Sequence, residues 1–392
     1  MKDLTPFFSA IILFLLLFRN FFSEGFLVYP DFFQIFGAVS GVKALPLYLS
    51  SWSFGAMGSI NITSLPDYVI LGLLSDLGIV GVITEIFTIF FFLSISCIAL
   101  YFIIKRVTNN PWIISFLEVL YFLTPTLFIE IFNGSADFTF YAMAPAFFLL
   151  SMNSIIYRKL SSMIYLGILL GFGVFWNPYA IIFIIPLLLT MLIISLLNSR
   201  SFRNIFTSFA FTVFPMVLAV LLNIPYFMSY FTSPSTLGNS LATISNTQGS
   251  LMLSTYQWAT PLRSLTLLAA SLFPRYSPFY SPLMNNLLYI LPFGALLGFI
   301  LPSTGQWHRT LKGTSAILII LSYSLIELGH YGLIELLFNR IPILYVDNYP
   351  DSFSILLNLG YSIIISLSFV SIFQNGIKSK IGILLNNSSI KP

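Results

Sequence analysis

Three acidic residues in the first half of the sequence have the type and setting that chemistry requires. Asp31 lies in FLVYPDFFQIF, where a proline precedes it and aromatic residues flank it. A carboxylate in such an apolar niche can act as a general base or hold a divalent cation. Glu130 and Asp137 flank a predicted turn in FIEIFNGSADFTF. Their oxygen atoms are ligands that suit Mg²⁺ or Mn²⁺.

Each of these acids also has a structural interpretation. Asp31 would cap a short helix that begins at Phe32, and Asp137 would cap the helix that follows it. Glu130 would reach water from the end of a helix. Taken one by one, the acids fit these roles at least as well as the chemical ones, so both interpretations stay open.

Three arginines have the chemistry to bind a phosphate group. Arg340 lies in ELLFNRIPILYVDNYPD, and a guanidinium can bind phosphate through two hydrogen bonds. A salt bridge from Arg340 to Glu335 or Asp347 is an equal alternative. Arg263 and Arg275 lie in a long Ser- and Thr-rich segment. Each would bind a lipid phosphate or extend from an interfacial helix into water.

Two further carboxyl groups, Glu85 and Glu118, lie inside long apolar runs. Ionisable groups within a membrane are functional candidates by default, because the bilayer makes them costly. We expect Glu85 to face the site, and Glu118 to pair with an Asn, Ser or Tyr of a neighbouring helix. His330 and Asp347 are additional candidates, although a single histidine at a membrane edge is more often structural.

The composition explains why so few residues are candidates for a functional site. Of the 392 residues, 57% are hydrophobic and only 8% are charged, against roughly 25% charged in an average soluble domain. A soluble globular protein cannot hide that much apolar surface. The one cysteine, Cys97, excludes a disulfide framework, and the two histidines exclude a His-rich metal site. The sequence also lacks the P-loop, HExxH, GxSxG and Rossmann motifs.

About ten membrane-spanning helices are predicted to position the candidate residues, since a helical span needs about 20 apolar residues. The first resembles a signal peptide but lacks a small-x-small cleavage site, so we interpret it as a retained span. The predicted ranges are 5–22, 78–104, 112–131, 138–157, 160–176, 178–197, 204–223, 286–302, 314–330 and 353–375. The fold class is thus an all-α polytopic membrane protein.

These spans form a single domain over residues 1–392. It comprises a seven-span module (1–223), a long segment with interfacial or re-entrant helices (224–285) and three C-terminal spans (286–392). Residues 23–77 and 331–352 form two more long segments, and the first contains amphipathic stretches that suit the membrane interface. Long segments in a compact chain are usually functional.

The basic residues predict the orientation, because Lys and Arg collect on the cytoplasmic side of a membrane protein. With the N-terminus inside, most of the 17 basic residues become cytoplasmic. These are Lys2, Lys105, Arg106, Arg158, Lys159, Arg200, Arg203, Arg309, Lys312, Lys378, Lys380 and Lys391. Both termini are therefore predicted in the cytoplasm of a cell-membrane protein. The positive charges occur as short pairs, which argues against a nucleic-acid partner.

Most of the acids and the long segments fall on the opposite, outer side, and this arrangement resembles the GT-C superfamily of membrane glycosyltransferases. The resemblance is carried by Asp31 in YPDF after the first span, by Glu130 and Asp137 near the next outer turn, and by seven spans before a large outer segment. FNRIPILYVDNYPDSFSILLNLGY also resembles the late R-x-P loop of archaeal and actinobacterial GT-C-like proteins. A WWD-type motif, a strict DxD and a soluble C-terminal domain are missing.

The resemblance implies an enzyme of the cell envelope that transfers a sugar from a polyprenyl-phosphate donor at the outer face, with inversion. Asp31 would be the catalytic base or a metal ligand, Glu130 and Asp137 would ligate Mg²⁺ or Mn²⁺, and Arg340 would stabilise the leaving lipid phosphate. A lipid or oligosaccharide transporter or flippase, and a non-catalytic membrane subunit on the same scaffold, are the alternatives. Membrane lipids are further expected partners, and the composition is compatible with an archaeal source.

Overall fold

The described part of the chain is helical throughout. The computed structural model describes residues 11, 12, 15, 82–124, 126, 135–176, 180–198, 202–224, 265–267, 288–303, 305–330 and 350–387, and no strand occurs among them. The all-α prediction is confirmed for these residues. The first predicted span, 5–22, lies almost wholly outside them.

The helices follow the predicted ranges from residue 78 onward. They are α6 (Val82–Ile104), α7 (Pro111–Phe122), α9 (Ser135–Ser151), the π-helix η4 (Met152–Ile156), α10 (Leu160–Trp176), α11 (Ala180–Leu197), α12 (Phe202–Leu222), α17 (Ile290–Ile300), α18 (Gln306–His330) and α20 (Pro350–Asn387). The boundaries differ most at the end of α20, which continues to Asn387 instead of ending at the predicted residue 375, and at α7, which ends at Phe122 instead of the predicted residue 131. Pro125 explains the end of α7, because the residue before a proline disfavours helical conformation.

Three of the described helices are long and apolar enough to cross a membrane. The apolar stretches are Arg203–Leu222 in α12, Gln306–Leu328 in α18 and Phe353–Phe373 in α20. The other apolar helices, such as Pro111–Phe122 and Leu160–Gly173, are described over shorter lengths. These three stretches support a protein that is embedded in a membrane.

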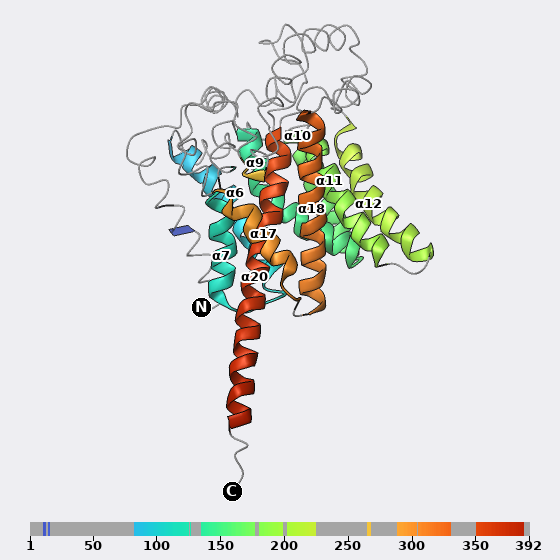
Figure 1. Cartoon of the computed structure of the whole chain (residues 1–392). Helices are drawn as coiled ribbons and strands as arrows, with labels where there is room; N and C mark the ends of the chain where they lie inside the picture. The colour runs from blue at the N-terminus through green and yellow to red at the C-terminus, as the bar shows by residue number, and fades with distance from the viewer. Residues whose placement is uncertain are drawn as a thin grey trace.

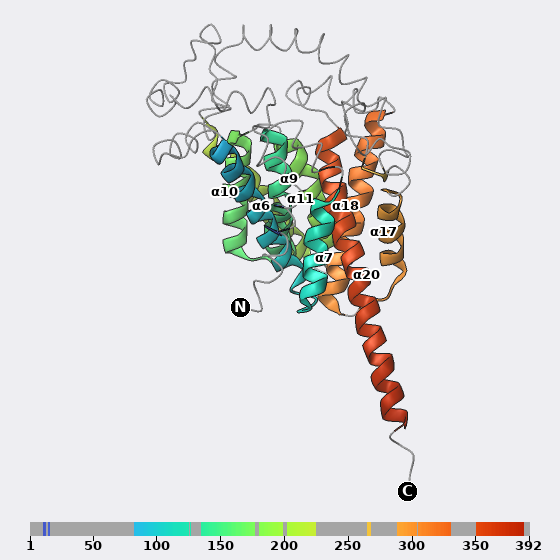
Figure 2. The same ribbon diagram turned by 90° about the vertical axis from the view of Figure 1, so that its left-hand side faces the viewer.

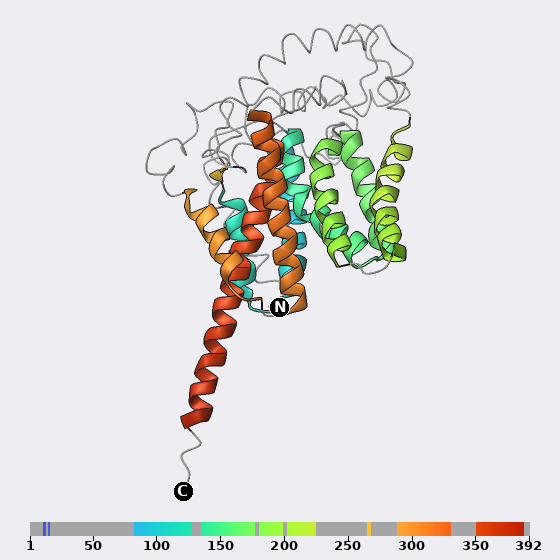
Figure 3. The same ribbon diagram turned by 45° about the vertical axis from the view of Figure 1, so that its right-hand side comes forward.

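α20 is the central helix of the bundle and α12 is a peripheral one. Most of the apolar stretch of α20 is buried by its neighbours, whereas less than a quarter of that of α12 is buried. Figures 1 and 3 show α20 among α7, α17 and α18, with α12 at the edge. The C-terminal part of α20 extends beyond the other helices, as Figure 2 shows. The exposed apolar side chains of α12 are those that lipid would cover.

Short connections gather at one end of the bundle, which we call the short-connection end. The helix ends that meet there belong to four successive pairs, α6 and α7, η4 and α10, α11 and α12, and α17 and α18, with only a few residues of sequence between the two helices of each pair. They lie at the lower end of the bundle in Figures 1 and 3. The helices on either side of each connection run in opposite directions, as short connections require. The other ends of α12, α18 and α20 lead to the long segments.

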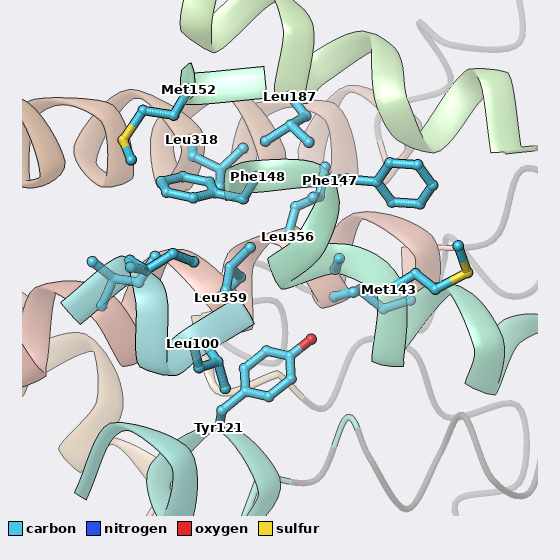
Figure 4. Packing of buried hydrophobic residues seen from close by; sticks show 14 of the residues in the cluster. Leu100, Tyr121, Met143, Phe147, Phe148, Met152, Leu187, Leu318, Leu356 and Leu359 are labelled. Carbon is cyan, nitrogen blue, oxygen red and sulfur yellow. The ribbon is translucent and has the colours of Figure 1, made fainter. Parts of the chain in front are cut away.

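The buried core joins helices that are far apart in the sequence. Figure 4 shows apolar side chains of α6, α7, α9, α11, α18 and α20 packed together. Fully enclosed members are Leu100, Tyr121, Phe147, Phe148, Leu187, Leu318, Leu356 and Leu359. Close packing of this kind holds helices together in a membrane, where lipid removes most of the hydrophobic drive for helix association.

A proline inside α12 creates a tertiary hydrogen bond. Pro215 has no N–H, so the carbonyl of Phe211, four residues earlier, loses its helical donor. The Ser154 hydroxyl of η4 donates to that carbonyl oxygen at 3.4 Å. The kink-prone position in α12 is therefore also the point where η4 is attached to it.

Gly298 allows α17 to approach α20 closely. A Cβ atom at this position would lie 2.5 Å from Cγ2 of Ile364 and 2.7 Å from its carbonyl oxygen. These distances are too short for any side chain, and the carbonyl oxygen belongs to a backbone that cannot move aside. The contact therefore requires glycine.

We predict that Gly298→Ala destabilises the protein by about 1–3 kcal/mol, because the two helices must separate. Gly305→Ala is the matched control, since no atom lies within 4 Å of its Cβ position. The measurement is the midpoint of thermal unfolding of each variant in detergent. Equal midpoints for the two variants would contradict the prediction.

Candidate functional site

Most residues predicted for the outer-face site lie outside the described residues. They are Asp31, Glu130, Arg263, Arg275, Arg340 and Asp347. For Glu85, Asp137 and His330 only the backbone is described, near the start of α6, in the first turn of α9 and at the end of α18. Asp137 thus lies in the first turn of α9 and does not cap the helix from the position before it, as the sequence predicted. The helix dipole favours an acid in this first turn. The outer-face metal site stays a prediction.

Within the described residues, no group of three or more His, Cys, Asp or Glu side chains is placed to hold a metal ion. Glu118 of α7 is nevertheless a functional candidate, because the bundle encloses it completely. Its side chain is 0% exposed, and neither carboxyl oxygen has a hydrogen-bond partner. The expectation that it pairs with an Asn, Ser or Tyr is therefore wrong for the part of the chain that the structure describes.

Cys97 of α6 defines the surroundings of Glu118. The thiol is buried and lies near the carboxyl group, and α6 and α7 pack against each other. Burying a carboxylate without a partner costs several kcal/mol. The neutral, protonated form of the carboxyl group is therefore favoured in such a place. The position of Glu118 is thus suited to holding and exchanging a proton.

Beside Glu118 along α7, Tyr121 forms a pair with Tyr141 of α9. The rings stack with centroids 4.7 Å apart. The Tyr121 hydroxyl donates to the Tyr141 carbonyl oxygen at 2.6 Å, and the Tyr141 hydroxyl donates to the Tyr121 carbonyl oxygen. Both carbonyls need a donor, since Pro145 removes the helical partner of Tyr141 and Tyr121 lies in the last turn of α7. The pair therefore ties α7 to α9.

Asn358 connects the tyrosine pair to the central helix α20. Its Nδ2 donates to the Tyr121 carbonyl oxygen at 3.2 Å and contacts the Tyr141 hydroxyl at 3.4 Å. The Ser362 hydroxyl lies 3.5 Å from its Oδ1. These polar groups satisfy one another, so their role is to hold three helices together. The carboxyl group of Glu118, in contrast, has no hydrogen-bond partner in the described part of the chain.

The sequence contains a signal for Asn358 that hydropathy does not detect. Ser354, Asn358, Ser362 and Ser366 recur every fourth residue through an apolar run. Residues four apart share one face of a helix, and all four are buried. Small and polar residues on one face are typical of helix contacts within membranes. This spacing predicts a buried contact face, but the partner residues Tyr121 and Tyr141 carry no comparable signal.

We predict that Tyr121→Phe lowers stability by about 1–2 kcal/mol, because the Tyr141 carbonyl oxygen loses its donor. Pro145→Ala restores an N–H that can bond that carbonyl within α9. In the Pro145→Ala background, Tyr121→Phe should therefore cost less than in the unmodified protein. Thermal unfolding of the two single variants and the double variant measures the coupling. Strictly additive effects would contradict this account of the tyrosine pair.

At the short-connection end, Arg106 joins three elements through one guanidinium group. Its Nη2 donates to Asn153 Oδ1 of η4 at 2.7 Å, and its Cζ lies 4.6 Å from the ring centroid of Trp307 in α18. The Trp307 ring stacks on that of Tyr157 at 4.2 Å. Burial lowers the pKa of Arg106, and the nearby Tyr157 opposes this shift. An arginine nevertheless stays charged, so this end carries a cation whose partners are an amide and aromatic rings.

Comparisons with protein-family models, with curated proteins and with solved structures find no match to this chain. The described helices and their apolar stretches support a helical protein of the membrane-embedded class. Its distinguishing features are a buried Glu118 that has no hydrogen-bond partner among the described residues, and a basic short-connection end. The function is therefore inferred from the chemistry of the chain itself.

Proposed function

We propose that the protein is a polytopic membrane glycosyltransferase of GT-C type. It has about ten spans and both termini in the cytoplasm, and it transfers a sugar from a polyprenyl-phosphate donor to an acceptor at the outer face. The observation that supports this best is the asymmetry of the bundle. Four successive helix pairs, α6 and α7, η4 and α10, α11 and α12, and α17 and α18, meet at one end of the bundle with only a few residues of sequence between the two helices of each pair.

The asymmetry between the two ends of the bundle favours a lipid-linked sugar donor over a nucleotide sugar. The described connections at the basic end have no room for a nucleotide-sugar-binding domain, and positive charges mark this end as cytoplasmic. The long segments 23–77, 224–285 and 331–352 then belong to the outer face, together with most of the acids. A lipid-linked sugar presents its donor group at that face, and the membrane provides for its apolar tail.

The reaction follows from the predicted roles. An oxygen of the acceptor hydroxyl attacks the anomeric carbon, and the bond from that carbon to the phosphate oxygen breaks. Polyprenyl phosphate leaves with the electron pair, and Asp31 takes the acceptor proton. Glu130 and Asp137 would hold Mg²⁺ or Mn²⁺, which would supply positive charge near the phosphate, while Arg340, Arg263 and Arg275 would bind the lipid phosphate. Displacement from the opposite face inverts the anomeric configuration.

The test is a transfer assay with purified protein in lipid vesicles. Polyprenyl-phosphate sugars with a radiolabelled sugar are compared with the corresponding nucleotide sugars, and the release of polyprenyl phosphate is measured with the labelled product. The proposal expects turnover of the lipid-linked donor alone, and loss of turnover after chelation of divalent cations. Turnover of nucleotide sugars alone, or of no polyprenyl-phosphate sugar in the panel, would contradict it.

A second candidate function is that of a transporter or flippase for a lipid or oligosaccharide. Glu118 is the observation that supports it, since a buried carboxyl without a partner among the described residues suits proton coupling. In this case the same vesicles would move the lipid-linked sugar between leaflets without breaking the bond to phosphate.

A further inference from the structure

Three basic residues are brought to one corner where α10 and α12 begin. Arg158 precedes α10, and its Nη1 donates to Asn204 Oδ1 of α12 at 2.8 Å. Its Nη2 also lies 3.4 Å from the Asn204 carbonyl oxygen. Lys159 and Arg203 are the sequence neighbours of Arg158 and Asn204, and both are exposed. The bond between the two helix starts therefore gathers three cations, which we call the α10–α12 basic corner.

The backbone at Arg158 is held in an uncommon conformation. Its φ is 53°, in the left-handed region that a non-glycine residue adopts at a cost. This conformation accompanies the bonds from the guanidinium to Asn204. The corner is thus maintained against a local backbone preference.

No acid of the described chain neutralises the α10–α12 basic corner. The described acids lie in the halves of their helices that point away from the short-connection end; they are Glu85, Glu118, Asp137, Glu327 and Asp351. Asn204, the partner of Arg158, is uncharged. Three positive charges beside an apolar bundle favour an anion from outside the described chain.

The surface next to the corner is apolar and open. Leu160 is 60% exposed and Phe206 is 67% exposed, each within a few residues of the cations. α12 is the peripheral helix (Figure 3), and α10 packs closely against it, because Gly167 leaves space for Leu218. An exposed apolar surface that ends in cations matches the boundary between the acyl chains and the headgroups of a bilayer.

We propose that Arg158, Lys159 and Arg203 bind the phosphate of an anionic phospholipid, whose acyl chains cover the exposed side chains of α10 and α12. The site faces the leaflet at the short-connection end. The site lies at the end of the bundle opposite to the predicted outer face, so its test does not depend on glycosyl transfer.

The test measures lipid binding by the purified full chain in a neutral detergent. Phosphatidylglycerol and phosphatidylcholine are titrated separately, and bound lipid is counted by native mass spectrometry. Lys159→Gln and Arg203→Gln should each weaken phosphatidylglycerol binding by about fivefold, and the double variant by about 25-fold. Arg309→Gln, an exposed cation of α18 at the same end, is the matched control and should retain binding.

Two further measurements distinguish a phospholipid site from a site for free phosphate and from nonspecific lipid binding. Raising the salt concentration should weaken the binding of phosphatidylglycerol to the unmodified protein, which requires no variant to fold. Inorganic phosphate should not displace the lipid; if it does, the corner is a site for free phosphate. Equal binding of phosphatidylglycerol and phosphatidylcholine, or an equal loss in Arg309→Gln, would overturn the proposal.

Discussion

Replacing Asp31 by Asn is expected to lower sugar transfer from a polyprenyl-phosphate donor by about 10²–10⁴-fold. Asparagine has nearly the same size but cannot accept the proton of the acceptor hydroxyl. The loss should appear in kcat, with little change in KM, because proton removal occurs on the way to the transition state. Initial rates at saturating donor and varied acceptor measure both constants.

Asp67→Asn is the matched control, because Asp67 is an acid of the same predicted outer segment, 23–77. It should retain activity close to that of the unmodified protein. Full activity of Asp31→Asn would show that Asp31 is not the base. Equal losses in both variants would point to a general effect of charge in this segment rather than to catalysis.

Glu118 carries the second large prediction, which concerns stability. Glu118→Gln removes only the ability to ionise and should change the free energy of unfolding by less than about 1 kcal/mol. Glu118→Lys introduces a cation that cannot easily reach water, and it should cost about 2.5–3.5 kcal/mol or prevent insertion. Yield in the membrane fraction and thermal unfolding in detergent measure these effects. Equal stability of the two variants would show that the site is more open to water than its burial indicates.

The Glu118→Gln variant also distinguishes the two candidate functions, glycosyltransferase and transporter. A glycosyltransferase whose chemistry lies at the outer face should keep its transfer rate in Glu118→Gln. A proton-coupled transporter should lose the movement of substrate driven by a pH gradient. A hydrophobic carbodiimide should label the unmodified protein and Glu85→Gln, but label Glu118→Gln less. Loss of transfer with no loss of folding would give Glu118 a part in the proposed reaction.

Much of the helix placement could be predicted from the sequence, since hydropathy over about 20 residues is a local property. Each range from 78–104 onward contains a helix of the structure. The prediction was less accurate where other local rules acted. α7 stops before Pro125, and α18 begins at Gln306 because a helix continues through polar residues that a hydropathy criterion rejects.

The site was harder to predict. Hydropathy identified Glu118 as a carboxyl inside an apolar run, and the structure confirms its burial. Its expected pairing was wrong within the described residues, because the partners of a side chain depend on which helices lie beside it. Tyr121 and Tyr141 were missed for the same reason: each satisfies the carbonyl of the other across two helices. The roles of Asp31, Glu130 and Asp137 stay predictions.

The sequence by itself determined the helical class and the separation of charge along the chain, because both follow from the local order of apolar and charged residues. Only the tertiary structure decided which donors reach the carbonyls that Pro145 and Pro215 leave free, and that Glu118 has none among the described residues. A hydrogen bond acts over about 3 Å. Helices distant in the sequence must therefore pack before it can form or be found missing.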